Sequence, residues 1–163
     1  MIKIKIQNPN IDRNIPTFYP FLRFRDLLRE YSIEITDSDD FDYLFVGMHD
    51  FINKQIPLKD SIEYGLENLS KISGDYFLFD GSDSTSLMGA YEVLKESDAI
   101  YLFKNQKLKN RSDYKVPYAF NKFFYGIGSK IDLSYDISKD DWNRIKFSHK
   151  NQGLYVKILS YYN

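Results

Sequence analysis

The stretch Gly74-Asp75-Tyr76-Phe77-Leu78-Phe79-Asp80-Gly81-Ser82-Asp83-Ser84-Thr85-Ser86 decides the fold class of this chain. Its four consecutive apolar residues are typical of a short strand buried on both faces, as strands of parallel sheets are. The polar residues after them predict a loop, and the pattern from Leu87 to Glu96 predicts a helix behind that loop. A buried strand, a loop that contains glycine and a helix, in this order, indicate one unit of an α/β fold.

The same succession repeats along residues 1–104. Strands are predicted over residues 1–7, 32–35, 43–46, 76–79 and 99–103, and helices over residues 21–31, 58–71 and 87–96. This alternation predicts one Rossmann-like, three-layer α/β domain with a mainly parallel sheet, and 163 residues suit a single domain. Its α/β core spans residues 1–104, and an irregular C-terminal third over residues 105–163 holds two candidate edge strands, 145–147 and 154–159.

The first predicted helix has a helical stripe of apolar side chains. Phe21, Phe24, Leu28 and Tyr31 fall on one face of a helix over residues 21–31. Pro20 fits the first turn of such a helix, where a missing backbone N–H does no harm.

Composition and charge exclude several classes of function. The net charge is −1, so nucleic acid is not an expected partner. The chain has no Cys and two His, which excludes disulfides and Cys-bound zinc, and we predict neither a metal site nor a cofactor. No apolar run approaches the ~20 residues of a membrane span, and residues 1–7 alternate Lys with Ile where a signal peptide would be continuously apolar. We therefore expect no membrane span and a cytoplasmic location.

In a parallel sheet, ligands bind beyond the carboxyl ends of the strands, because the following loops meet there. If the sheet is parallel, one rim holds the predicted ligand-binding residues Asn8, Asp80, Gly81, Asp83, Ser84, Thr85 and Lys104, together with the candidate catalytic residues His49 and Asp50.

The loop after residue 79 has two readings. Glycine and small hydroxyl residues before a helix offer N–H groups to an anion, but Asp83, Ser84 or Ser86 is also a preferred helix N-cap. Asp80 and Asp83 would repel a phosphate, so hydroxyl groups of a sugar, or Mg²⁺, suit this loop better.

Two resemblances to known families involve this loop. The ATP-pyrophosphatase loop Ser-Gly-Gly-x-Asp-Ser-Thr matches at Gly81, Asp83, Ser84 and Thr85 but not at Phe79 and Asp80, and it implies nucleotide hydrolysis or adenylation with Mg²⁺. The second resemblance covers residues 1–125. Residues 41–47, residues 74–86 and Ala99–Lys104 followed by a basic stretch resemble, in layout, the N-terminal half of GT-B-type glycosyltransferase-like proteins.

The GT-B resemblance implies an acceptor-side domain that binds a sugar or glycan acceptor. His49, oriented by Asp50, would deprotonate an acceptor hydroxyl, while Asp80 and Asp83 would accept and Ser84 and Thr85 would donate hydrogen bonds. A second domain or chain would hold the nucleotide sugar, so the chain is expected to be incomplete for catalysis alone. Whether it is an enzyme stays open at this point.

A third reading is a non-catalytic binding or assembly module. Residues 34–98 hold 15 acidic and 4 basic side chains, whereas residues 101–130 hold 7 basic and 1 acidic. Such an asymmetry is typical of two solvated faces, and a basic edge over residues 104–130 would dock an acidic partner.

Overall fold

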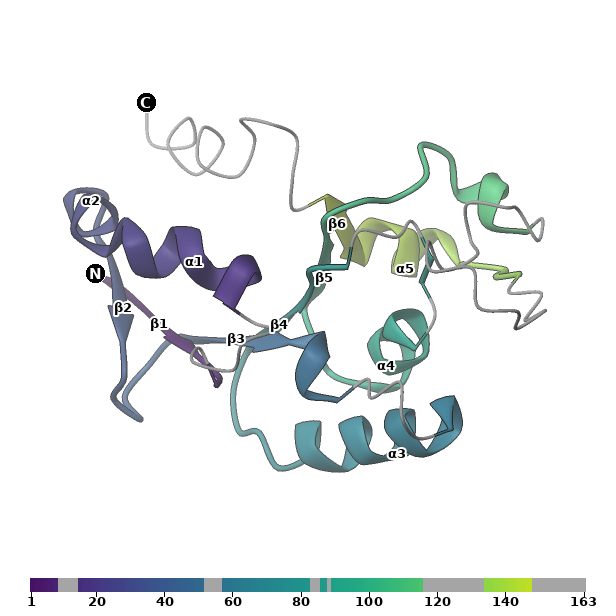
Figure 1. The fold of residues 1–163 in the computed structure, drawn as a ribbon, viewed down its shortest axis with the longest axis horizontal. Coiled ribbons are helices and arrows are strands. Elements are labelled where there is room, and N and C mark those ends of the chain that lie inside the picture. The colour runs from purple at the N-terminus through teal and green to yellow at the C-terminus, as the bar shows by residue number, and fades with distance from the viewer. Residues whose placement is uncertain (9–14, 52–56, 83–85, 88, 116–133, 148–163) are drawn as a thin grey trace.

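The computed structural model describes residues 1–8, 15–51, 57–82, 86–87, 89–115 and 134–147. It is an α/β domain in which helices lie on both faces of a sheet (Figure 1). The strands are β1 (Ile2–Ile6), β2 (Ile33–Thr36), β3 (Tyr43–Gly47), β4 (Tyr76–Asp80), β5 (Tyr101–Lys104) and β6 (Ile145–Phe147). The helices are α1 (Ile15–Arg23), α2 (Arg25–Glu30), α3 (Leu58–Leu69), α4 (Ala90–Glu96) and α5 (Lys139–Arg144), with short 3₁₀ turns η1 (Met48–Asp50) and η2 (Arg111–Lys115).

The six described strands form one sheet in the order β2-β1-β3-β4-β5-β6. Each neighbouring pair is parallel, so the sheet is parallel throughout its described part. The predicted Rossmann-like α/β class is confirmed. Of the two candidate edge strands, residues 145–147 form β6 at the edge, and residues 154–159 lie outside the described residues.

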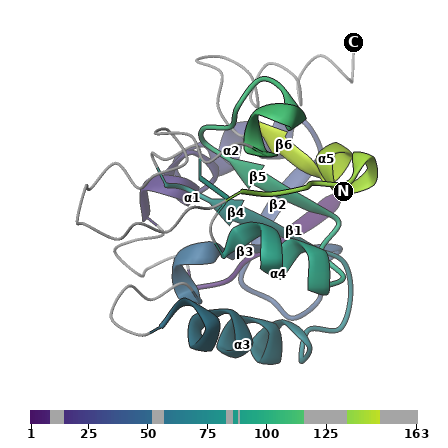
Figure 2. The ribbon, with the colours of Figure 1, turned by 90° about the vertical axis from the view of Figure 1, so that its right-hand side faces the viewer.

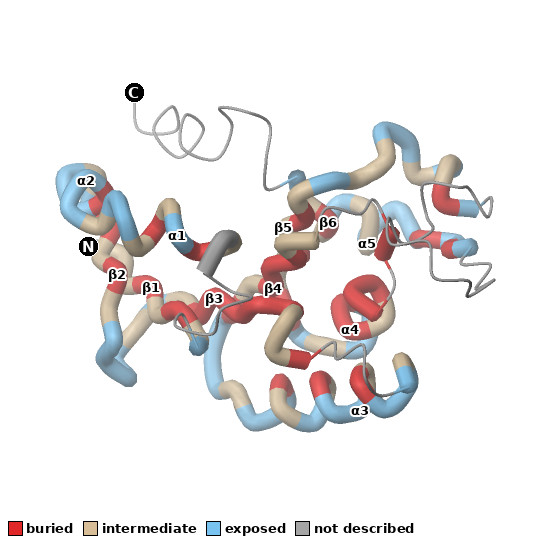
Figure 3. The backbone as a smooth tube through the Cα atoms, in the orientation of Figure 1, coloured by how far each residue is buried: buried red, intermediate tan, exposed pale blue. Residues whose placement is uncertain are grey.

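Two apolar cores lie on opposite faces of the sheet. Figure 2 shows the helices around the sheet, and Figure 3 shows which parts of the backbone carry the buried residues. On the α1 face, α1 and α2 cover the first half of the sheet, where Phe18 and Phe21 pack against Phe45 and Phe79. On the α3 face, α3, α4 and α5 cover β3 to β6 around a larger core that contains Val46, Leu78, Leu87, Leu94, Leu102 and Ile145. The period-two pattern of β1 follows from this arrangement, because Ile4 and Ile6 point to the α1 face.

The prediction of one helix over residues 21–31 was wrong. The helix breaks at Phe24, whose backbone leaves helical geometry and whose side chain is 47% exposed. Pro20 lies inside α1 rather than in a first turn, because α1 begins earlier, at residue 15. The break turns α2 so that Leu28 still reaches the core.

The helix predicted from residue 87 also begins later than expected. Its N-cap is Gly89, with φ +76°, a left-handed conformation that glycine adopts without a Cβ clash. The prediction that Asp83, Ser84 or Ser86 caps this helix was therefore wrong. Among the described helices, none is long and apolar enough to cross a membrane.

Candidate functional site

The site is built around a change of direction in the sheet. From β1 the chain crosses to β2 on one side and then returns past β1 to β3 on the other. Connections on either side of such a switch point leave the sheet on opposite faces, and ligands of open α/β sheets bind in the crevice at the carboxyl ends there. Here the switch point lies where β1 ends at Ile6 and β3 ends at Gly47.

Asn8 and Asp50 meet across this switch point. The Asn8 side-chain amide donates to Asp50 Oδ2 at 3.2 Å, and one step earlier the Gln7 N–H donates to the Phe45 carbonyl at 2.8 Å. Asn8 has φ +47°, a left-handed conformation that Asn tolerates better than most residues, and it lets the chain turn directly after β1. Two predicted site residues, 42 positions apart, are thus in contact.

His49 lies beside this pair in the turn η1. Met48 and Phe51 are each 3% exposed and pack into the α3-face core, so they anchor both ends of the turn. The residues between them, His49 and Asp50, are half-buried at the surface. Buried anchors on both sides fix a histidine and a carboxylate at the rim.

The next strand places a buried ion pair at the same edge. Because β3 and β4 are parallel, with Gly47 opposite Phe79, the end of β4 adjoins the His49 turn. Asp80 ends β4 and Lys104 ends β5, and the Lys104 ammonium donates to the Asp80 carboxylate. Lys104 is completely buried and Asp80 is 9% exposed.

This pair determines the charge of Asp80. Burial alone would raise the pKa of the Asp80 carboxyl, but the charge and hydrogen bond of Lys104, with hydrogen bonds from Ser82, outweigh it and hold the pKa below its ordinary value. Asp80 is therefore ionised inside the protein.

Further hydrogen bonds fix the start of the loop after β4. The Ser82 N–H donates to Asp80 Oδ1 at 3.0 Å, and the Asn105 side-chain amide donates to the Gly81 carbonyl at 2.9 Å. A Cβ built on Gly81 would lie 2.0 Å from Thr17 Oγ1 of α1, so this position accepts only glycine without rearrangement. The base of the predicted loop is therefore hydrogen-bonded to the residue after β5 and lies against α1.

The structure therefore gathers the predicted residues into two neighbouring groups at one edge. One group is Asn8, His49 and Asp50, and the other is Asp80, Gly81 and Lys104. Asp83, Ser84 and Thr85 lie outside the described residues. Lys104 was predicted at the rim and instead ends β5 as a fully buried partner of Asp80.

Sequence reasoning placed Asn105 at the rim beside Lys104 without giving it a role, and it did not single out Gln7 or Thr17. Asn105 carried a signal, since it follows the last strand of the core directly. The contact of Thr17 with Gly81 is tertiary and has no local signal. Within the described residues, no three His, Asp or Glu side chains converge as a metal site would require.

Comparisons of the chain with protein-family models, with curated proteins and with solved structures found no match in any of the three.

Proposed function

We propose that this domain binds a sugar or glycan acceptor as the acceptor-side domain of a GT-B-type glycosyltransferase-like protein. Transfer would need a second domain or chain that holds the nucleotide sugar. The observation that supports the proposal best is the Asn8–Asp50 pair beside His49 at the switch point.

These side chains match what a hydroxyl nucleophile requires. An acceptor O–H donates its hydrogen bond to the imidazole of His49, which takes the proton as the oxygen bonds to the anomeric carbon of the donor sugar. The bond from that carbon to the nucleotide breaks in the same step, and the nucleotide, held by the second domain or chain, leaves with the electron pair. The role of the neighbouring Asp50 carboxylate, which is to orient this imidazole and to stabilise the imidazolium that forms, stays a prediction. The Asn8 side-chain amide donates a hydrogen bond to Asp50. Amide and carboxylate groups together offer hydrogen-bond donors and acceptors, which suits a neutral ligand that carries hydroxyl groups.

The second group has a supporting role in this proposal. The Asp80–Lys104 ion pair fixes the base of the loop that continues to Asp83, Ser84 and Thr85. Hydrogen bonds between those three residues and acceptor hydroxyls stay predictions, as does a hydrogen bond from a hydroxyl to Asp80.

The test is ligand-induced thermal stabilisation of the full chain. A panel of methyl glycosides and short oligosaccharides at about ten times Kd would stabilise the protein by about 1.4 kcal/mol, which raises Tm by roughly 3–6 °C. We expect Asn8→Ala and Asp50→Asn to lose this shift. Lys59→Met, which removes an exposed ion pair on α3, is the control and keeps it.

Other results would favour the competing readings. Stabilisation by ATP with Mg²⁺ that Asp83→Ala abolishes, without any response to sugars, would replace the proposal by the pyrophosphatase-like reading. A chain that responds to neither class and purifies as a tight oligomer through residues 104–130 would replace it by the assembly module.

A further inference from the structure

The connection from β2 to β3 is unusually short. Parallel strands usually need a crossover of about a dozen residues or more, often a helix, whereas residues 37–42 alone join β2 to β3. This segment, here the acidic link, runs beside β1: the Asp42 N–H donates to the Lys3 carbonyl at 2.9 Å, and the Lys5 ammonium pairs with Asp39. No helix of the described chain therefore packs on the α3 face of β1.

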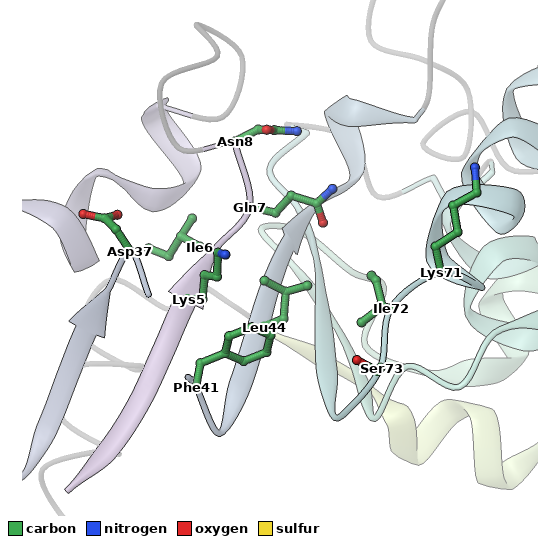
Figure 4. Close-up of a pocket in the computed structure, with 10 residues that line it drawn as sticks. All are labelled: Lys5, Ile6, Gln7, Asn8, Asp37, Phe41, Leu44, Lys71, Ile72 and Ser73. Carbon is green, nitrogen blue, oxygen red and sulfur yellow. The ribbon is translucent and has the colours of Figure 1, made fainter. Parts of the chain in front are cut away.

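A hollow of about 820 Å³ lies where that helix is missing (Figure 4). This volume is within the range of small-molecule sites, ~300–1,000 Å³. Side chains from β1, the acidic link, β3 and the segment after α3 line the hollow: Lys5, Gln7, Asp37, Phe41, Leu44 and Ser73 are among them, and Asn8 stands at its end.

Gln7 carries an unmet requirement for a hydrogen bond. Its side-chain oxygen Oε1 is buried and has no hydrogen-bond partner among the residues that the structure describes. Figure 4 shows the Gln7 side chain between the ends of β1 and β3, at one end of the hollow. A buried acceptor without a donor costs about 1–3 kcal/mol. Because Oε1 is covered in this conformation, a turn of the half-buried Gln7 side chain must bring it to a ligand O–H or N–H in the hollow, and the new hydrogen bond then removes that cost.

The charges of the lining favour a neutral ligand. Its two lysines already have carboxylate partners, because Lys5 pairs with Asp39 and Lys71 pairs with Glu67 at 2.9 Å. A phosphate would have to displace those carboxylates from both ammonium groups, whose ion pairs are partly exposed, and it would meet Asp37 as well.

The lining also offers an apolar surface. The Phe41 ring lies in the wall, with the Lys5 ammonium 5.7 Å from its centre, and Leu44 and Ile72 lie nearby in the same lining. A sugar ring combines C–H groups, which pack on aromatic rings, with hydroxyl groups at its edge. The hollow presents both kinds of partner.

We propose that the hollow is a sugar subsite, in which one ring of the acceptor packs on Phe41 and donates a hydroxyl hydrogen bond to Gln7 Oε1. This inference rests on the proposed function and extends it. Asn8 belongs both to the hollow and to the pair with Asp50, so a glycan in the hollow continues toward His49.

The experiment is an NMR titration of the uniformly ¹⁵N-labelled full chain. The probes are methyl glycosides of glucose, galactose, mannose and N-acetylglucosamine, with adenosine for comparison. We expect at least one glycoside to shift the amides of residues 5–8, 41 and 71–73 in a saturable way. Gln7→Leu should weaken Kd at least about fivefold, and Phe41→Leu should weaken it too. The control is Gln106→Leu, the same substitution at an exposed glutamine, and its Kd should not change.

A second readout separates ligand binding from a structural role. Gln7→Leu removes a buried acceptor without a partner, so the free variant should be at least as stable as the wild type. A marked loss of Tm with unchanged Kd would show that Gln7 supports the fold and would overturn the subsite.

The remaining outcomes separate the two proposals. Shifts confined to residues 8, 49 and 50 would refute the subsite and leave the proposed function standing. Shifts in the hollow that Gln7→Leu weakens, without any response at residues 49 and 50 even with a di- or trisaccharide of the same sugar, would support the subsite and refute the acceptor role of His49. Binding of adenosine in the hollow without binding of any glycoside would overturn the sugar assignment, and no shift with any probe would overturn both proposals.

Discussion

Replacing the buried lysine of the Asp80–Lys104 pair tests the most consequential interaction of the rim. Lys104→Met keeps the length and apolar stem of the side chain but removes the charge. It leaves the Asp80 carboxylate buried without its counter-charge, since Lys104 is completely buried and Asp80 is 9% exposed. Breaking a buried pair in this way costs about 3–5 kcal/mol, which corresponds to a fall in Tm of roughly 6–20 °C for a chain of this length.

The pH dependence distinguishes this cause from lost packing. In the wild type the pKa of Asp80 is lowered, so its contribution to stability is present above the unfolded pKa of ~3.9 and is lost as pH falls through the folded value. In Lys104→Met the raising effect of burial has no counter-charge, so we expect a raised pKa. The loss in free energy of unfolding that the variant causes is then largest at neutral pH, and it becomes smaller as pH falls and Asp80 becomes protonated.

The assay is urea unfolding of both proteins at neutral pH and near pH 5. Asp80→Asn combined with Lys104→Met should recover most of the lost stability, because no unpaired charge is then buried. Lys59→Met breaks an exposed ion pair and should cost less than about 1 kcal/mol. A loss below about 1 kcal/mol for Lys104→Met, or the same loss at both pH values, would refute the electrostatic reasoning.

Three further substitutions or titrations test other parts of the fold. Gly81→Ala forces a Cβ against Thr17, so we expect a loss of about 1–3 kcal/mol in chemical denaturation, and recovery in Gly81→Ala with Thr17→Ala; a neutral single variant would contradict the contact. Burial raises the pKa of Tyr114 to about 12. Its contribution to stability is therefore fully present below pH ~10, the unfolded pKa, and is lost as pH rises toward 12. In Tyr114→Phe the free energy of unfolding should fall less steeply with pH over this range. The Ser138 hydroxyl accepts the Asp141 N–H at 3.0 Å as the N-cap of α5, so Ser138→Ala should lower the free energy of unfolding by about 1 kcal/mol and Ser138→Asp should not; equal losses would exclude capping.

The strands could be predicted because their environment is simple. Residues 43–46 and 76–79 are apolar on both faces, and the structure packs both faces of β3 and β4. The alternation of Ile and Lys in β1 also predicted its burial, because one face meets α1 and the other lies by the acidic link. In both cases the local pattern contains the information.

Features that depend on contacts between distant segments could not be predicted. The break at Phe24 depends on how α1 and α2 fit the sheet, and an unbroken apolar stripe concealed it. The hollow exists because the acidic link contains no helix. In the sequence this link is only a short polar turn, and nothing in the local pattern shows that it runs beside β1. The pairing of Lys104 with Asp80 required the register of β4 and β5.

The parallel topology of the sheet explains which residues of the candidate site could be predicted from the sequence. A parallel sheet brings all strand ends to one edge, so residues directly after the strands, such as Asn8 and Asp50, were foreseeable. Gln7 also lies directly after β1, but the sequence pattern assigned it to the predicted strand over residues 1–7, and only the structure shows its side chain in the lining of the hollow.

The position of β1 between β2 and β3 also bears on the order of assembly during synthesis. Both neighbours of β1 are complete once residue 47 has left the ribosome, so half of the sheet can form from the nascent chain before α3 exists. The opposite edge is different, since β6 joins β5 only after residues 105–144 have been added. Closing a connection of this length makes the docking of β6 a late event, whereas the rim around Asn8 is in place early.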